Sequence, residues 1–291
     1  MDSCSSKPKL PLKQQICNGY VPVLFSMSNN EIVSKKEPQS IFLLLPRMSY
    51  LLLVTNKIRK YFTPYAAALS DGIWFKYNDY PLKWNMPIGI LFDLFNAENE
   101  CSGPVWKVTV HFQSYPEEEI MRCDHIDTVK SMYFNALKQS IFLAYGNIHC
   151  ISKLNKNDQN SLWNSICKAN YNSYFAIYES IFTRNSDKLI RYPVRIILRG
   201  FDPSLDLIPI QRPIQVQNNE SMTLNQCLTD IIPGVMTMYH NQLKNNKNHQ
   251  NTMKINIIIQ GIKMPLDVPL LWLIQNATAV DCFLYIAVIQ Q

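Results

Sequence analysis

DTVKSMYFNALKQSIFLAY, the stretch Asp127–Tyr145, predicts a long helix in the middle of the chain. Its apolar residues recur at the steps that place side chains on one face of a helix. We expect the buried stripe of this helix to consist of Ile126, Val129, Tyr133, Leu137 and Ala144. Gly146 and Asn147 follow directly and are typical of a helix end. Strand-like patterns lie on both sides of this region, so the helix divides the chain.

Lys138 lies beside the apolar stripe, with Phe134, Ile141 and Phe142 at its i−4, i+3 and i+4 positions. One interpretation is a surface lysine whose methylene stem covers apolar side chains while its ammonium group stays in water. The other is an amine presented on an apolar platform of Phe134, Ile141 and Phe142, where another protein docks. The helix pattern alone does not decide between the two.

The part of the chain before this helix predicts a sheet with one helix across it. Strands are expected at 20–27, 40–45 and 105–112, and a hairpin over 73–84 turns at Asn78-Asp79. A helix is expected over 49–62 and a short helical turn over 87–92. This order of elements is that of the β-grasp arrangement of ubiquitin.

The part after the helix repeats this pattern. Strands are expected at 194–198, 213–217, 255–259 and 283–289, and a further short apolar run at 269–273. A helix over 224–232 would begin at the N-cap Thr223 and stop at Pro233-Gly234. The polar stretch 241–251 is expected to be disordered. Ile73 and Pro87 are separated by the same fourteen residues as Ile255 and Pro269, which indicates two copies of one fold.

The chain is therefore predicted to be α+β, with two ubiquitin-like β-grasp domains flanking a helix-rich domain. The expected boundaries are 1–19 for an N-terminal lead with a short helix, 20–116 for the first ubiquitin-like domain, 117–188 for the helix-rich domain and 189–291 for the second ubiquitin-like domain. Within the helix-rich domain, Asp158 is the expected N-cap of a second helix.

Composition excludes several classes of protein. The chain has 291 residues, 47% of them hydrophobic and 17% charged, which is enough apolar material for real cores. Its net charge of +6 is spread over small basic groups, so no nucleic-acid footprint is expected, although attraction to an anionic membrane surface remains open. None of the eight cysteines forms a C-x-x-C pair, and no signal peptide is recognisable. A cytoplasmic protein with reduced thiols is expected.

The motifs of common enzymes are missing from the sequence. It contains no glycine-rich phosphate loop, no H-E-x-x-H and no G-x-S-x-G. The local pairs Cys123 with His125 and His149 with Cys150 reproduce no nucleophile motif, so a cysteine-dependent enzyme is the weakest alternative. We expect no catalytic residue, no metal and no cofactor. Grooves between the three domains would suit an amphipathic partner helix, near Pro87–Gly89.

Several segments resemble the autophagy-related protein five family. The first is IFLLLPRMSYL at 41–51, and PLKW at 81–84 leads into PIGILFDL at 87–94. The resemblance continues through WKVTVHF at 106–112, QGI at 260–262 and PLLWL at 269–273. These motifs occur in order along nearly the whole chain. Cys17 stands where a tryptophan is usual, and Gln139-Ser140 where Glu-Ala is commoner.

The resemblance implies a component of the conjugation system that builds autophagosomes. In the family, a helix lysine receives the carboxy-terminal glycine of a ubiquitin-like modifier, autophagy-related protein twelve, through an isopeptide bond, and Lys138 matches that position. With the coiled-coil autophagy-related protein sixteen, the conjugate promotes transfer of a second ubiquitin-like protein from its conjugating enzyme to phosphatidylethanolamine. The groove for the coiled-coil partner would include Arg47 and Gly89.

Three further expectations follow from the resemblance. The chain would be a ligase-like scaffold without catalytic residues of its own, and it would be cytoplasmic and peripheral on preautophagosomal membranes. The alternative is a peripheral membrane or interaction protein that binds the modifier only non-covalently. Whether the linkage is covalent stays open at this point.

Overall fold

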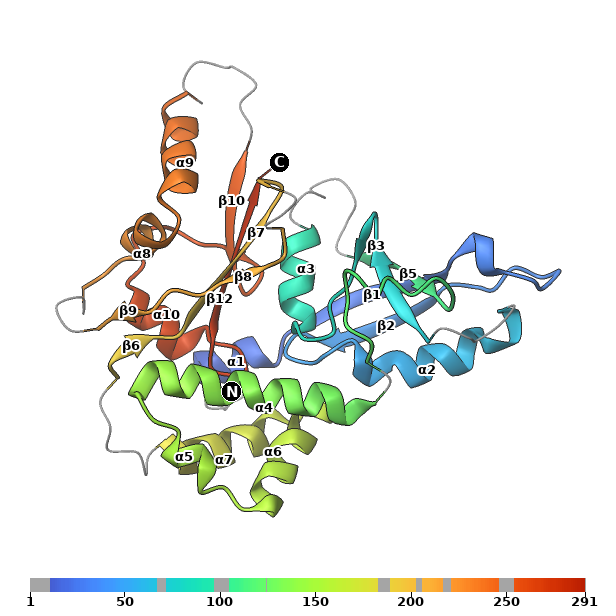
Figure 1. The fold of residues 1–291 in the computed structure, drawn as a ribbon, viewed down its shortest axis with the longest axis horizontal. Helices are drawn as coiled ribbons and strands as arrows, with labels where there is room; N and C mark the ends of the chain where they lie inside the picture. The colour runs from blue at the N-terminus through green and yellow to red at the C-terminus, as the bar shows by residue number, and fades with distance from the viewer. Residues whose placement is uncertain are drawn as a thin grey trace, which may run out of the picture.

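The computed structural model describes residues 11–66, 72–96, 105–123, 125–182, 189–202, 206–216, 221–245 and 254–290. Two sheets stand side by side above a layer of helices, with the N-terminus near α4 and the C-terminus at the upper end of the second sheet (Figure 1). The first ubiquitin-like domain runs from blue to green, the helix-rich domain from green to yellow-green, and the second ubiquitin-like domain from yellow through orange to red.

The first sheet has the predicted β-grasp topology. Its strands are β1 (Tyr20–Met27), β2 (Ile41–Pro46), β3 (Trp74–Tyr77), β4 (Tyr80–Pro81) and β5 (Trp106–His111), in the order β2-β1-β5-β3-β4. The central strands β1 and β5 run parallel, and the remaining neighbours pair antiparallel. Helix α2 (Leu52–Phe62), the short turns η1 (Asn29–Glu31) and η2 (Thr63–Tyr65), and helix α3 (Ile88–Asn96) complete the domain.

The second sheet repeats this topology strand for strand. It consists of β7 (Val194–Arg199), β8 (Pro209–Ile210), β10 (Ile255–Ile259), β11 (Ile262–Lys263) and β12 (Leu284–Gln290), in the order β11-β10-β12-β7-β8. Here β7 and β12 are the parallel central pair. Helices α8 (Leu224–Ile231), α9 (Pro233–Asn245) and α10 (Leu270–Asn276) accompany it, and β6 (Arg191–Tyr192) pairs with β9 (Ile214–Gln215) as a separate ribbon. The predicted pair of ubiquitin-like domains is confirmed.

The helix-rich domain lies between the two sheets in sequence and beneath them in space (Figure 1). It contains α4 (Ile126–Tyr145), α5 (His149–Ser152), α6 (Lys156–Cys167) and α7 (Tyr171–Phe182). Gly146 ends α4 in the left-handed conformation, with φ of 74°, as expected of a glycine there. The N-terminal α1 (Leu12–Cys17) packs on α7 and α10, and its Cys17 is buried.

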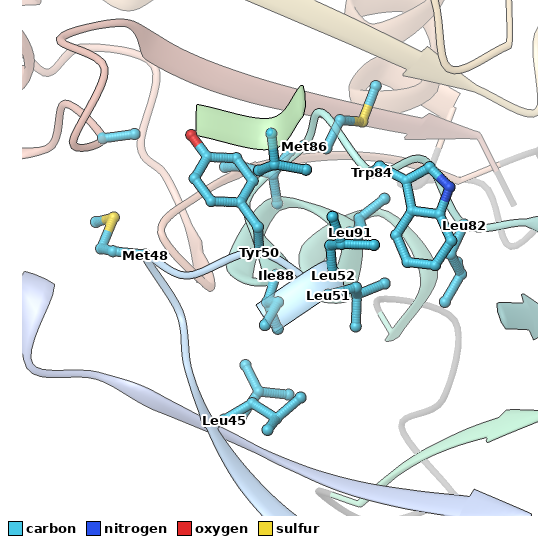
Figure 2. Close-up of a cluster of buried hydrophobic side chains, with 14 of the residues drawn as sticks. Leu45, Met48, Tyr50, Leu51, Leu52, Leu82, Trp84, Met86, Ile88 and Leu91 are labelled. Carbon is cyan, nitrogen blue, oxygen red and sulfur yellow. The ribbon is translucent and has the colours of Figure 1, made fainter. Parts of the chain in front are cut away.

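One apolar core runs through the first ubiquitin-like domain and the helix-rich domain. Figure 2 shows the part where the segment after β2 meets α3 and the Trp84 loop. Tyr50 continues it toward the helices, because its ring lies 6.4 Å from that of Trp163, which in turn lies 5.8 Å from Tyr133. The three rings join the first sheet to α4 and α6.

Strand β12 connects this core to the core of the second ubiquitin-like domain. Leu284, Ile286 and Val288 face the second core, whereas the alternate residues Tyr285, Ala287 and Ile289 belong to the first. A strand that is buried on both faces reads as a continuous apolar run, and LYIAVI has that character. The two ubiquitin-like domains therefore share a buried junction, in which α3 packs on β12.

Several local expectations were wrong. Helix α8 ends at Ile231, as expected before Pro233-Gly234, but the same pair also begins the unpredicted helix α9, because a proline in the first helical turn lacks only an N–H that would have no partner there. Part of the stretch expected to be disordered, 241–245, belongs to α9, and 246–251 lies outside the described residues. Asn155, not Asp158, caps α6, since its side chain accepts the N–H of Asp158 at 2.7 Å. The second hairpin strand is only Tyr80–Pro81.

Candidate functional site

Lys138 lies on the solvent side of α4 and its side chain is exposed. Of the expected platform, Phe142 is 52% exposed and Phe134 is half-buried. Ile141 is only 1% exposed, so its assignment to a surface platform was wrong. It lies one turn after Leu137 and continues the buried stripe, whereas Ile126, in the first turn of α4, is 46% exposed.

A shallow hollow of about 380 Å³ opens beside Lys138. Helix α4 contributes most of its lining, and Ile151 and Gln159 close it from the neighbouring helices. The α4 side chains are Asp127, Lys130, Ser131, Phe134, Asn135 and Lys138. Lys130 donates from Nζ to Oδ1 of Asn160 at 2.8 Å, which ties this second lysine to α6.

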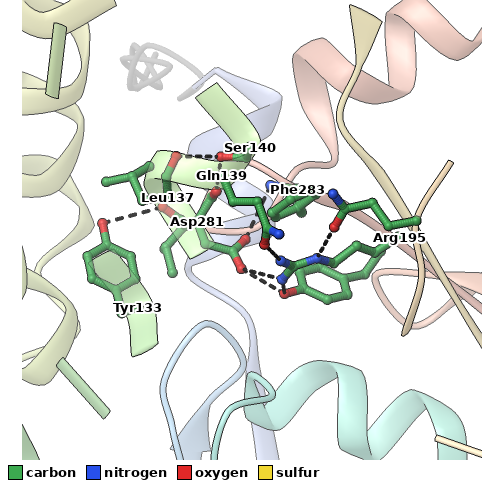
Figure 3. A network of polar contacts seen from close by, with 10 residues as sticks. Tyr133, Leu137, Gln139, Ser140, Arg195, Asp281 and Phe283 are labelled. Carbon is green, nitrogen blue, oxygen red and sulfur yellow. Dashed lines mark hydrogen bonds and ion pairs between the residues drawn. The ribbon is translucent and has the colours of Figure 1, made fainter. Parts of the chain in front are cut away.

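The two residues after Lys138 are fixed to the second ubiquitin-like domain (Figure 3). Gln139 accepts a hydrogen bond on Oε1 from Nη2 of Arg195 at 2.6 Å. Ser140 is completely buried, and its hydroxyl donates to the carbonyl oxygen of Asp281 at 2.6 Å. The backbone that carries Lys138 is therefore held from the opposite side of the helix.

Arg195 is itself held by a buried polar network. Its guanidinium donates to the Tyr285 hydroxyl at 2.9 Å, and that hydroxyl donates to Oδ2 of Asp281 at 2.7 Å. The guanidinium also lies 3.5 Å from the centroid of the Phe283 ring, a cation–π distance. Burial raises the pKa of Asp281, and the nearby Arg195 opposes that shift. Each group has charged or hydrogen-bonding partners, so the network is rigid.

Arg47 and Gly89, the expected residues of the partner groove, meet at the junction of the two ubiquitin-like domains. The Arg47 side chain is 11% exposed and packs among Gly19, Gly89 and Gly261. A Cβ at Gly89 would lie 3.0 Å from both Cβ and the backbone oxygen of Arg47, and one at Gly19 would lie 2.9 Å from Arg47 Cδ. Glycine at these positions makes room for the arginine.

Asp93 on α3 is the ion-pair partner of Arg47. Its carboxylate lies 2.6 and 2.7 Å from Arg47 Nη2 and is 2% exposed. Its Oδ2 also accepts the backbone N–H of Gly261 at 2.8 Å, from the β10–β11 turn of the second domain. Burial raises the pKa of Asp93, and Arg47 and the Gly261 N–H oppose the shift. Sequence reasoning missed Asp93, although a lone carboxylate inside the apolar run ILFDLF was a usable signal.

His111 forms a second, largely buried polar contact with Glu31, at the end of β5. Its Nδ1 lies 2.8 Å from Oε1 of Glu31, whose Oε2 accepts the N–H of Phe112 at 2.6 Å. The imidazole stacks on Trp74, with ring centroids 4.2 Å apart. Burial lowers the pKa of His111 from its usual 6.5, Glu31 opposes that shift, and Lys76 adds to it.

Other candidate chemistry finds little support in the structure. Cys123 is buried and its thiol lies 3.9 Å from the carbonyl oxygen of His125, whose side chain is exposed. Within the described ranges, no three histidine, cysteine, aspartate or glutamate side chains are grouped as a metal site would need. In the same part of the chain, no helix has the length and apolarity needed to span a membrane.

Three family profiles match the chain in succession. They are described as the UblA domain, the alpha-helical bundle region and the UblB domain of autophagy protein ATG5, over residues 16–112, 126–184 and 191–288. Together they follow the two sheets and the helices between them.

Individual relatives agree with these profiles. The autophagy protein 5 of Oryza sativa subsp. indica is 27% identical, over 94% of this chain and 92% of that protein. The autophagy protein 5 of Dictyostelium discoideum is 26% identical over 68% of this chain, and the match spans 63% of its own length. The crystal structure of Kluyveromyces marxianus Atg5 shares the fold with a TM-score of 0.74 and 22% identity, covering 95% of this chain and 98% of that one. The chain therefore belongs to the autophagy protein 5 family and has a role in autophagy.

Proposed function

We propose that this chain is an autophagy scaffold that accepts a ubiquitin-like modifier, autophagy-related protein twelve, on Lys138. The observation that carries the proposal is that one turn of α4 presents an exposed lysine while the two residues after it are anchored to another domain. Lys138 is exposed beside a hollow, whereas Gln139 and Ser140 are fixed to the second ubiquitin-like domain. An amine on a rigid backbone meets an incoming reactive group with little loss of conformational freedom.

The reaction needs only a correctly placed nucleophile from this chain. The neutral Lys138 amine attacks the thioester carbonyl carbon of the modifier on its conjugating enzyme, and the amine proton passes to solvent. A C–N bond forms, the C–S bond breaks, and the enzyme's cysteine leaves as thiolate. Phe134 and Phe142 offer apolar surface for the modifier, and the hollow has room for its extended tail.

A second partner would sit at the junction marked by Arg47 and Gly89. This coiled-coil protein, autophagy-related protein sixteen, would pack an amphipathic helix against the ubiquitin-like domains, a common mode of peptide recognition. The Asp93 carboxylate supports this site indirectly, because it pairs with Arg47 in the first domain and accepts the N–H of Gly261 from the second, which links the two domains there. The complex would then promote transfer of a second ubiquitin-like protein to phosphatidylethanolamine, at the surface of preautophagosomal membranes.

The test is reconstitution with the modifier and its activating and conjugating enzymes, read on a denaturing gel. Wild type is expected to give a shifted band that Lys138→Arg abolishes, because the guanidinium does not act as the nucleophile at neutral pH. Lys153→Arg, an exposed lysine outside the hollow, is the matched control and should leave the shift unchanged. A shift that survives Lys138→Arg would contradict the assignment of the acceptor. Stable co-purification without any shift would favour the alternative, non-covalent pairing.

The role of Phe142 is tested with the same assay. Phe142→Ser removes exposed apolar surface without opening the core, so we expect slower conjugation with an unchanged midpoint of thermal unfolding. Met238→Ser, an exposed apolar residue on α9, is the control. Equal conjugation rates for the three proteins would remove Phe142 from the docking surface.

A further inference from the structure

The outer edge of β2 is open for pairing. Across the described residues, β2 pairs only with β1 and is the end strand of the first sheet. The N–H of Arg47 donates to the carbonyl oxygen of Gly19 at 2.9 Å, so Arg47 and Gly19 form a hydrogen-bonded pair. Such pairs alternate along an antiparallel ladder. The backbone groups of Phe42 and Leu44, at the alternate positions, therefore point outward, away from β1.

The other edge strands of the two five-stranded sheets are different. Strands β4, β8 and β11 are two residues long, with the sequences YP, PI and IK. Short length, proline and lysine are the usual protection of a sheet edge against pairing with another chain. Strand β2 has six residues, no charge and no proline before its last position. It is the long unprotected edge of these two sheets.

The side chains beside this edge form an apolar face on the solvent side of the sheet. Phe42 and Leu44 are 67% and 64% exposed, while Ile41, Leu43 and Leu45 turn to the core side. The register places Leu24 opposite Phe42 and Pro22 opposite Leu44, so these apolar side chains share one face. We call this surface, made by Pro22, Leu24, Phe42 and Leu44, the β2 face.

Basic side chains border the β2 face. Lys107 on β5 is exposed and lies opposite Leu24, in the same row as Phe42. Lys35 and Lys36 are exposed in the segment that leads into β2, with Glu37 as the acidic neighbour there. Lys107 together with the segment that precedes β2 therefore contributes three lysines and one glutamate, a net positive charge. Two copies of the chain paired edge to edge would bring these like charges together, which disfavours self-association.

We propose that β2 binds an extended peptide segment of a partner protein as an additional strand of the first sheet. The backbone of the peptide would pair with the outward groups of Phe42 and Leu44, the mode known as β-augmentation. Apolar side chains at alternate positions of the peptide would cover the β2 face. Acidic residues on either side of this apolar centre would meet Lys107, Lys35 and Lys36. The site is independent of Lys138 and of the domain junction.

A synthetic probe tests the proposal on the full chain. The probe is a fluorescein-labelled peptide with the sequence Val-Ile-Val-Leu between two aspartates at each end, and its counterpart carries lysines in their place. We expect the acidic peptide to bind at least about tenfold more tightly by fluorescence anisotropy, and to protect the Phe42 and Leu44 amides from hydrogen exchange.

Variants distinguish backbone pairing at the edge of β2 from non-specific hydrophobic binding of the peptide. Leu44→Pro removes an outward N–H while leaving the ladder to β1 intact, as prolines do on edge strands. It should weaken binding at least tenfold, and Leu44→Lys should also weaken it, because it replaces apolar surface of the β2 face with a charged group that the apolar centre of the peptide would have to desolvate. Met238→Lys, which places the same charge on exposed α9, is the control and should bind like wild type. If Leu44→Pro does not fold, Leu44→Lys and the amide protection carry the test.

Four results would overturn the proposal. They are equal binding of the acidic and basic peptides, unchanged binding by both Leu44 variants, and amide protection that avoids β2. The fourth is no acidic-peptide binding by folded wild type. In that case, self-association lost in Leu44→Pro would identify a second copy as the occupant, and binding to phosphatidylcholine–phosphatidylserine vesicles lost in the uncharged variant Leu44→Ser would identify a membrane.

Discussion

Replacing Arg47 with alanine should destabilise the chain strongly, even though the side chain touches solvent. The change leaves the Asp93 carboxylate, 2% exposed, without its cation. Removing one partner of a buried ion pair costs about 3–5 kcal/mol, because the remaining charge stays desolvated. The Gly261 N–H still donates to Asp93 at 2.8 Å, so a value near the lower end of that range is expected.

The chain contains a matched surface pair that serves as control. Arg122 lies 2.8 Å from Glu117, almost the same distance, but the two side chains are 46% and 65% exposed. Exposed pairs contribute about 0–1 kcal/mol, because water solvates both charges before and after the change. Arg122→Ala should therefore reduce stability by less than about 1 kcal/mol.

Urea unfolding followed by circular dichroism measures both variants, since urea carries no charge that would screen the pair. The double variant Arg47→Ala with Asp93→Asn should lose less stability than the sum of the single variants, with a coupling of about 2 kcal/mol. A loss below about 1 kcal/mol for Arg47→Ala, or additive single variants, would refute the stabilising role of the buried ion pair between Arg47 and Asp93.

Three further predictions concern buried groups. Gly89→Ala places a Cβ 3.0 Å from the backbone oxygen of Arg47 and should lower the free energy of unfolding by about 1–3 kcal/mol, measured in urea. Gly234→Ala is the control and should not lower it, because a Cβ there has nothing within 4 Å. Ser140→Ala leaves a buried carbonyl without its 2.6 Å donor and should cost about 1–3 kcal/mol, and stability unchanged in urea would contradict the anchoring of α4. His111 is less basic in the folded chain, so the unfolded chain binds more protons and stability should fall as pH drops below 6.5. His111→Gln should reduce this pH dependence of the free energy of unfolding. Equal slopes against pH for wild type and His111→Gln would contradict the prediction.

Long, periodic elements could be predicted well from the sequence. Strand β1 was expected at 20–27 and occupies Tyr20–Met27, because its alternation of buried and open positions is local information. The two-residue strands β6 and β8 were not predicted, since two residues carry no period. Helix α9 was missed because a Pro-Gly pair can begin a helix as well as follow one.

For the candidate site, too, some residues were predicted from the sequence and others were not. Through its resemblance to the family, the sequence predicted Lys138, Arg47 and Gly89 as site residues, and their roles stay predictions. It did not identify Asp93 or the contact of Gln139 with Arg195, since these partners come from segments far apart in the chain.

By itself, the sequence determined the order of elements, the repeated ubiquitin-like domain and the helix that carries Lys138. Those features follow from periodicity and turn residues, which act within a few positions of one another. Only the tertiary structure decided that Ile141 is buried while Phe142 is exposed, although both flank Lys138 on one helix. Burial depends on what packs against each face, and here those neighbours come from remote segments of the chain.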